Sequence, residues 1–157
     1  MNKTAIYPGT FDPITNGHLD IIERSSELFD NVLVAIATSE VKQPMFTLEK
    51  RLEFVEESIK KFDNVKVITF DTLLVSLMKE INCRYVIRGL RAVSDFEYEL
   101  QLNFANRSLL DGFESIYLMP SLEQSFVSSS IVRSILSHDG DASHLLPKEM
   151  WQLMKDV

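Results

Sequence analysis

Short apolar, β-branched segments alternate with stretches of helical periodicity along the chain, and this alternation limits the folds open to it. The apolar segments are expected to be strands and lie at 4–7, 32–38, 65–70, 85–88 and 115–119. Helices are expected near 17–29, 48–62, 73–81, 95–110, 129–137 and 148–155. Such alternation is typical of a parallel sheet covered on both faces. The sequence therefore predicts one α/β domain over residues 1–157, a doubly wound, Rossmann-like, five-stranded parallel sheet with helices on both faces.

The loops differ according to the end of the strand to which they are attached. Segments that lead into a strand carry ordinary turn residues, as at 30–31, 63–64 and 111–114. Segments that leave a strand are polar, cationic or glycine-bearing, and these are 8–18, 38–44, 88–91 and 120–130. Ligands of open parallel sheets bind beyond the carboxyl ends of the strands. The sequence therefore predicts one site assembled from four loops.

The run from Thr15 to His18 ends the first of these loops. Thr15 or Asn16 can cap a helix that begins here. The free N–H groups and positive dipole of a helix N-terminus suit a phosphate. A protonated imidazole in a first helical turn needs an anion opposite it, so His18 indicates a phosphate ligand. The alternative is a capped helix with an incidental surface histidine.

Arg88 and Arg91 flank Gly89 directly after the fourth expected strand. Guanidinium forks match phosphate oxygens, and a glycine lets the backbone approach a ligand closely. The alternative is that both arginines form surface ion pairs with carboxylates of the next helix, namely Asp95, Glu97 or Glu99.

Two further segments on the same edge carry groups that suit an anion. Lys42 precedes Pro44 in an exposed loop, where a lysine is ordinarily a solvated charge, and its place on the ligand edge makes it a candidate. Ser128, Ser129 and Ser130 precede an expected helix start. They could form a second anion cradle or simply cap that helix.

Composition and missing motifs exclude several classes of protein. The net charge of −7 argues against nucleic acid or an anionic membrane as the main partner, and no apolar run is long enough to span a bilayer. The single cysteine allows no internal disulfide, which fits a cytoplasmic location. The five glycines form neither GxGxxG nor GxxxxGK[ST], which argues against an NAD-dependent dehydrogenase and a P-loop kinase. Without CxxC or HExxH, zinc is not expected, and any metal would be Mg²⁺ arriving with a nucleotide.

Together these motifs resemble those of the nucleotidylyltransferase superfamily. The run from Thr15 to His18 matches its [HT]xGH motif, and the run from Val127 to Arg133 matches its ISSSxxR-like motif, with valine in place of the usual isoleucine. More narrowly, the chain is similar to the family of bacterial phosphopantetheine adenylyltransferases over segments 7–13, 44–47, 87–91 and 95–99. The match extends over essentially the whole length.

The resemblance implies transfer of the AMP moiety of ATP to 4′-phosphopantetheine, which gives dephospho-coenzyme A and pyrophosphate in coenzyme A biosynthesis. It also implies a homohexamer and feedback inhibition by coenzyme A. The nucleophile would be a phosphate oxygen that is already ionised, so no general base is needed. Alternatives are a nucleotidylyltransferase acting on nicotinate mononucleotide or a phosphorylated alcohol, and a nucleotide-binding regulator without activity.

The same resemblance assigns roles to particular residues. The catalytic set it implies is His18, Lys42 and Arg91. The implied ATP-binding residues are Thr10, Phe11, His18, Gly89, Leu90, Arg91, Glu99, Gln124, Ser125, Phe126, Val127, Ser128, Ser129 and Ser130. The implied acceptor-binding residues are Thr10, Lys42, Leu74 and Arg88. Gln124 stands where relatives carry an aromatic residue, and the residues alone would place Leu74 in the core.

Overall fold

The computed structural model describes residues 3–38 and 43–155. In these ranges the strands are β1 (Thr4–Gly9), β2 (Asn31–Ala37), β3 (Val65–Phe70), β4 (Tyr85–Gly89) and β5 (Glu114–Leu118). The α-helices are α1 (Asn16–Leu28), α2 (Leu48–Ile59), α3 (Leu74–Glu80), α4 (Val93–Leu109), α5 (Ser129–Leu136) and α6 (Lys148–Lys155). Short 3₁₀ turns, η1 (Leu122–Gln124) and η2 (Ser143–Leu145), precede α5 and α6.

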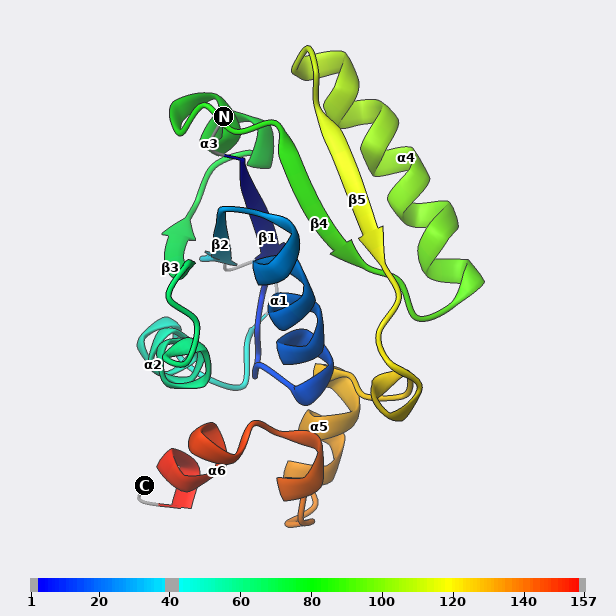
Figure 1. The fold of residues 1–157 in the computed structure, drawn as a ribbon. Coiled ribbons are helices and arrows are strands. Elements are labelled where there is room, and N and C mark those ends of the chain that lie inside the picture. Colours follow the sequence, from blue (N-terminus) through cyan, green and yellow to red (C-terminus); the bar gives the residue numbers. More distant parts are fainter. Residues whose placement is uncertain (1–2, 39–42, 156–157) are drawn as a thin grey trace.

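The strands form one parallel sheet in the order β3-β2-β1-β4-β5 (Figure 1). The chain winds outward from β1 to β3, returns through α3 to the other side of β1, and then continues to β5. The predicted doubly wound α/β fold is thus confirmed. The strand order reverses between β1 and β4, which is the topological switch point where ligands of such sheets bind.

The ladder between β1 and β4 is short. It pairs Ala5 with Tyr85 and Ile6 with Val86. By contrast, β1 stays paired with β2 as far as Gly9, and β4 stays paired with β5 as far as Gly89. The carboxyl ends of β1 and β4 therefore diverge, and a gap opens at the switch point.

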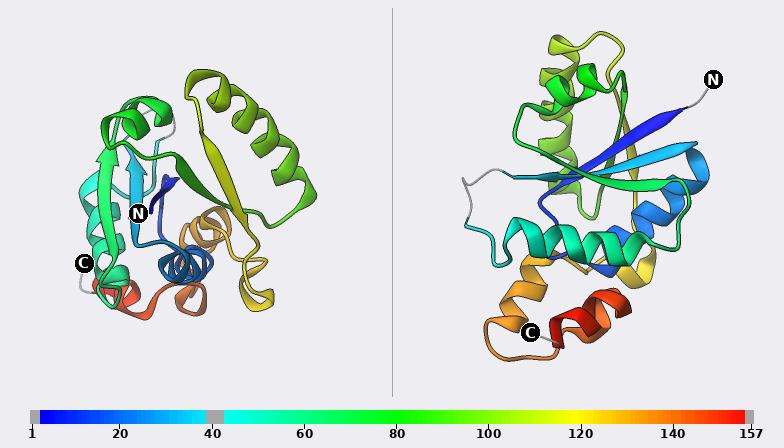
Figure 2. Two further views of the ribbon diagram at one scale, coloured as in Figure 1. Left: turned by 45° about the horizontal axis from the view of Figure 1, so that its top comes forward. Right: turned by 90° about the vertical axis from the view of Figure 1, so that its left-hand side faces the viewer.

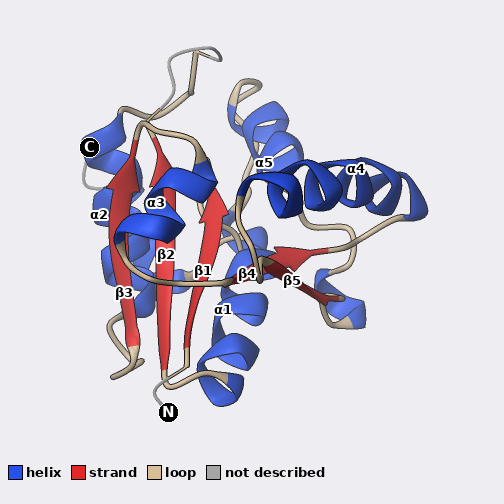
Figure 3. Cartoon of the chain, turned by 90° about the horizontal axis from the view of Figure 1, so that it is seen from above, coloured by secondary structure: helices blue, strands red, loops and turns tan. Residues whose placement is uncertain are grey.

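Helices cover both faces of the sheet (Figure 3), with α1 and α2 on one side and α3 on the other. The side chains of β1 alternate between these two layers, as strand geometry requires. Ala5 and Tyr7 belong to the buried cluster beneath α1 and α2, whereas Ile6 packs with Val75 and Met78 of α3.

The C-terminal helices lie at the carboxyl edge of the sheet (Figures 1 and 2). The start of α5 approaches the N-terminal end of α1, and α6 packs against α2. The long helix α4 lies along β5 at the edge of the sheet (Figure 1). Within the described ranges, every helix is too short or too polar to cross a membrane.

Candidate functional site

Two cavities meet where the strands end. The first has a volume of about 310 Å³ and lies at the β1–β4 switch point. The second, of about 290 Å³, lies between the loop after β1, the segment before α2 and the start of α5. His18, Ser129 and Ser130 line both cavities, so the first turns of α1 and α5 form the wall between them.

Most of the residues predicted from the sequence border these cavities. The first is lined by His18, Arg88, Gly89, Arg91, Glu99, Gln124, Val127, Ser128, Ser129 and Ser130. The second is lined by Thr10, Phe11, His18, Ser129 and Ser130. Leu74, Leu90, Ser125 and Phe126 border neither cavity. Lys42 lies outside the described residues.

Leu74 and Phe126 lie away from the cavities, one packed against the core and the other exposed. Leu74 is half-buried against the core cluster beneath α3, as its residue type alone suggests. The ring of Phe126 is 60% exposed. Neither residue lines one of the two cavities of the isolated chain.

The first turn of α1 fixes the orientation of His18. Thr15 is the N-cap, and its hydroxyl accepts a hydrogen bond from the His18 backbone N–H at 3.4 Å. In return, the Thr15 backbone N–H donates to Nδ1 of His18 at 3.1 Å. This is a reciprocal capping box in which histidine replaces the usual glutamate or glutamine. Because Nδ1 accepts, the neutral ring carries its proton on Nε2.

The environment of His18 keeps its ring uncharged. Burial, and secondarily the positive charge of Arg91, lower the pKa of His18 from 6.5 to about 4. Without an anion opposite it, the ring is therefore held neutral near pH 7. A neutral ring has no unfavourable interaction with the helix dipole, and its Nε2–H can still donate to a phosphoryl oxygen.

Three aromatic rings support one another below this turn. The Phe11 ring lies edge-on to Tyr7, with centroids 5.5 Å apart, and 5.0 Å from the His18 ring. Phe11 is 2% exposed, and its φ of 47° is one that few residues other than glycine adopt. A Cβ on Gly9 would lie 2.9 Å from this ring, so a glycine is needed there. The loop after β1 is thus built around a backbone conformation that packing holds in place.

Arg88 and Glu99 form a two-pronged ion pair at the mouth of the first cavity. Nε of Arg88 donates to Oε2 of Glu99 at 2.7 Å, and Nη2 donates to Oε1 at 2.5 Å. This realises one of the ion pairs considered from the sequence. A guanidinium carries five N–H groups, so Arg88 retains donors for a ligand while Glu99 orients it.

Arg91 has a looser partner. Its Nε lies 3.8 Å from Oδ2 of Asp95, and its backbone N–H donates to the same oxygen at 3.1 Å. The pair is one helical turn apart and solvent-exposed, so it contributes little stability. The Arg91 guanidinium is therefore held only weakly by Asp95.

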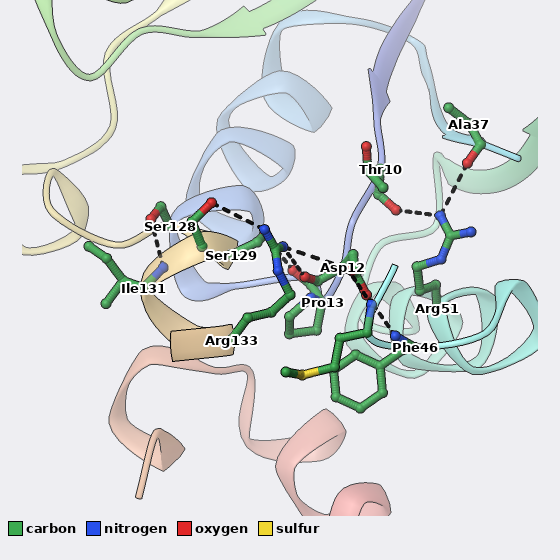
Figure 4. Close-up of polar contacts among 12 residues, drawn as sticks. Thr10, Asp12, Pro13, Ala37, Phe46, Arg51, Ser128, Ser129, Ile131 and Arg133 are labelled. Atoms are coloured by element: carbon green, nitrogen blue, oxygen red, sulfur yellow. Dashed lines mark hydrogen bonds and ion pairs between the residues drawn. The ribbon is translucent and has the colours of Figure 1, made fainter. Parts of the chain in front are cut away.

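Asp12, which was not predicted, joins the loop after β1 to the segment before α2 and to helix α5 (Figure 4). Its buried carboxylate accepts the backbone N–H groups of Met45 at 2.8 Å and Phe46 at 2.9 Å. Nη1 of Arg133 donates to the Asp12 carbonyl at 2.6 Å and lies 3.6 Å from the carboxylate. These partners are far from Asp12 in sequence, so no local pattern indicated the role.

Arg51 is a second unpredicted residue (Figure 4). It is 2% exposed, and its Nη1 donates to the carbonyls of Thr10 at 2.8 Å and Ala37 at 3.1 Å. It thereby ties the loop after β1 to the end of β2. Its position at helical spacing from Leu48 and Val55, on the apolar face of α2, was a signal in the sequence.

The start of α5 is held against the first loop (Figure 4). The Ser128 hydroxyl caps the helix by accepting from the Ile131 N–H at 3.2 Å. The Ser129 hydroxyl donates to the carbonyl of Pro13 at 2.8 Å. Nη2 of Arg133 donates to the Ser130 hydroxyl at 3.2 Å. Ser128 thus caps α5, and Ser129 fixes the helix to the loop after β1. The first turn of α5 borders both cavities.

Comparison with known proteins agrees with this geometry. The family model described as cytidylyltransferase-like matches residues 6–135. A phosphopantetheine adenylyltransferase of Campylobacter hominis is 60% identical over 99% of this chain and 98% of its own. The chain belongs to the phosphopantetheine adenylyltransferase family. Other members of that family from Helicobacter acinonychis and Helicobacter pylori are 57% and 56% identical, over 100% and 98% of both chains.

A solved structure with a distantly related sequence has the same fold as this chain. It is that of a Vibrio parahaemolyticus protein named for a suggested nicotinate-nucleotide adenylyltransferase activity. The TM-score is 0.76 at 20% identity, and the alignment covers 99% of this chain and 93% of that one. The phosphopantetheine adenylyltransferase family thus shares its sheet architecture with a protein of low sequence similarity.

Proposed function

We propose that this chain transfers the adenylyl group of ATP to 4′-phosphopantetheine, giving dephospho-coenzyme A and pyrophosphate in coenzyme A biosynthesis. The observation that carries the proposal is the 60% identity to a phosphopantetheine adenylyltransferase over 99% of the chain. The geometry supports it, because cationic side chains and two helix N-termini border adjoining cavities at the switch point.

In this reaction a phosphate oxygen of the acceptor attacks the α-phosphorus of ATP. The new O–P bond forms as the bond from the α-phosphorus to the bridging oxygen breaks, and pyrophosphate carries away the electron pair. The attacking oxygen is already ionised near neutral pH, so the protein supplies position and charge stabilisation rather than a base.

The proposed role of His18 is to donate a hydrogen bond to the reacting phosphoryl group. It borders both cavities, and its Nε2–H is the free donor of a ring fixed by Thr15. A preorganised donor of this kind stabilises charge that develops in the transition state. Together with His18, Lys42 and Arg91 complete the proposed catalytic set, and Arg91 borders the first cavity.

The two substrates are proposed to share the cavities. ATP would contact residues 89–91, Glu99 and the loop 124–130, with Thr10 and Phe11 toward the second cavity. The phosphate and arm of phosphopantetheine would contact Thr10, Lys42, Leu74 and Arg88. Gln124 borders the first cavity. Relatives carry an aromatic residue at this position, so here the ligand would meet a side-chain amide and not an aromatic ring.

Mg²⁺ is proposed to enter with ATP. Among the described residues, no group of three or more His, Cys, Asp or Glu is placed to hold a metal ion. The proposal rests on the chemistry of Mg²⁺, which keeps several waters and is commonly held by nucleotide phosphates with few protein ligands. When bound, the ion would neutralise part of the phosphate charge.

We further propose a homo-oligomer, a hexamer as in the family resemblance, which is inhibited by coenzyme A and works in the cytoplasm. The exposed face of α4 supports self-association. Phe96, Leu100 and Phe104, which helical spacing places on one side of α4, are 44%, 37% and 63% exposed, which is unusual for large apolar side chains. Sedimentation should show one defined oligomer, and a purely monomeric protein would refute this part.

A coupled pyrophosphate assay tests the reaction. Release from ATP should require phosphopantetheine and should not occur with nicotinate mononucleotide or a phosphorylated alcohol. Mass spectrometry should identify dephospho-coenzyme A. Binding of ATP with no turnover on any acceptor would instead indicate a nucleotide-binding regulator.

A further inference from the structure

The side chain of Tyr7 crosses the gap between β1 and β4. Tyr7 is the first residue of β1 beyond the last pair with β4, which joins Ile6 to Val86. Its hydroxyl oxygen lies 3.7 Å from the position that a Cβ on Gly89 would occupy. Tyr7 also lines the first cavity. The hydroxyl therefore sits on the floor of this cavity, at the carboxyl end of β4.

This hydroxyl lacks a hydrogen-bond partner among the described residues. Tyr7 is only 6% exposed, yet its oxygen is not among the fully buried atoms, so the hydroxyl is accessible from the cavity. Buried tyrosines usually satisfy their hydroxyl. An unmatched hydroxyl on a cavity wall indicates that a ligand atom completes it.

The surroundings indicate the chemistry of that atom. Burial raises the pKa of Tyr7, while the nearby charges of Arg88 and Arg91 lower it less, so the hydroxyl stays protonated at neutral pH and can donate. Its ring centroid is 6.3 Å from that of His18. A neutral donor beside two guanidinium groups suits an anionic oxygen.

We propose that the Tyr7 hydroxyl donates a hydrogen bond to a phosphoryl oxygen of the nucleotide bound in the first cavity. Tyr7 is then a further substrate-contacting residue. The proposal rests on the proposed function only in taking an adenine nucleotide as the ligand. The ring itself is held by Phe11, so the donor is already in place before the nucleotide binds.

The test is Tyr7→Phe, which removes the hydroxyl and keeps the ring. Calorimetry with AMP and with adenosine should show AMP binding weakened about tenfold or more and adenosine binding unchanged. The melting temperature should hold, because the hydroxyl has no partner among the described residues. Tyr85→Phe, the same change at the start of β4, is the matched control and should alter neither affinity. An AMP affinity within twofold of wild type, or equal weakening of AMP and adenosine, would overturn the proposal.

A second measurement needs no substitution in the protein observed. Tyrosine labelled with ¹³C at Cζ gives signals from the four tyrosines, and Tyr7→Phe serves only to assign one of them. AMP should shift the Tyr7 signal and adenosine should not; an unmoved signal with bound AMP would overturn the proposal. Neither experiment requires turnover. Failure of the pyrophosphate assay would therefore refute the proposed reaction without deciding the role of Tyr7.

Discussion

Nδ1 of His18 lies 3.1 Å from the backbone nitrogen of Thr15, so the ring is oriented by the turn that precedes its own helix. The same contact fixes which nitrogen carries the proton, and it leaves Nε2–H for a ligand. The histidine is thus both a helix cap and a donor, and these two roles can be separated by experiment.

His18→Ala should lower turnover by about 10²–10³-fold, the size expected when one preorganised donor is removed. ATP affinity should change much less, because the arginines and the start of α5 remain. The cap on α1 also weakens, so melting temperature should be measured beside kcat and ATP affinity. His138→Ala, at an exposed site that borders neither cavity, is the control. Near-normal turnover would remove His18 from the mechanism.

The low pKa of His18 predicts a pH dependence of stability. The folded protein holds the ring neutral down to about pH 4, whereas the unfolded chain takes up a proton near pH 6.5. Unfolding therefore binds a proton between these values, and the free energy of unfolding falls as pH drops through this window. His18→Gln cannot titrate, so its melting temperature should fall less than that of the wild type between pH 7 and 5. Parallel curves for the two proteins would contradict the lowered pKa.

Arg88→Ala should weaken phosphopantetheine binding by about tenfold to a hundredfold, and ATP binding by less. The change also leaves Glu99 without its two-pronged partner, which adds an unpaired carboxylate to the cavity. Calorimetry on both substrates makes the comparison. Arg107→Ala removes an arginine from a 4.0 Å surface pair and should change neither affinity. Unaltered acceptor binding in Arg88→Ala would exclude Arg88 from the acceptor site.

Two glycines near the site should respond differently to alanine. At Gly9 a Cβ would lie 2.9 Å from the Phe11 ring, and displacing that ring disturbs both Tyr7 and His18. Gly9→Ala should cost about 1–3 kcal/mol of stability and lower turnover. At Gly17 the nearest atom is 3.5 Å away, so Gly17→Ala should leave the melting temperature unchanged or raise it. Thermal melts of both variants decide this; equal loss in both would contradict it.

Asp12→Asn should destabilise the protein by about 2–4 kcal/mol. The amide can accept one of the two N–H groups from Met45 and Phe46 but presents its NH₂ to the other, and it loses the ion pair with Arg133. Chemical denaturation measures the loss. Asp63→Asn, on an exposed carboxylate, is the control and should change stability by less than about 0.5 kcal/mol. A loss of stability no larger than that of the control would show that other contacts hold the loop after β1, the segment before α2 and helix α5 together.

The sheet was predictable because periodicity and turn residues act locally. Residues 65–70 form β3 as expected, and α1 begins at Asn16, one residue before the expected start. The larger shift is at α4, which begins at Val93 rather than near 95. There the Asp95 carboxylate accepts the Ala92 N–H at 3.3 Å and so supports an earlier start.

The site was predictable as a set of loops but not as a set of contacts. Strand ends indicated where His18, Arg88 and the serines would gather. The sequence left open which of three carboxylates would pair with Arg88, and it did not indicate that Asp12 would bind N–H groups more than 30 residues away. The lowered pKa of His18 was not predictable for a related reason: it depends on burial and on Arg91, whose positions are set only by the folded chain.

The two-pair ladder between β1 and β4 divides the sheet into two ribbons, β3-β2-β1 and β4-β5. A nucleotide bound beyond Ile6 and Val86 would contact both ribbons and hold them together. Because the ligand binds only when the two ribbons are together, its binding stabilises the folded state against separation of β1 from β4. In hydrogen exchange, the amides that slow most on adding ATP should be those on either side of this junction rather than those of the continuous β1–β2 ladder. The proposed nucleotide site thus lies at the strand junction with the fewest backbone pairs in the sheet.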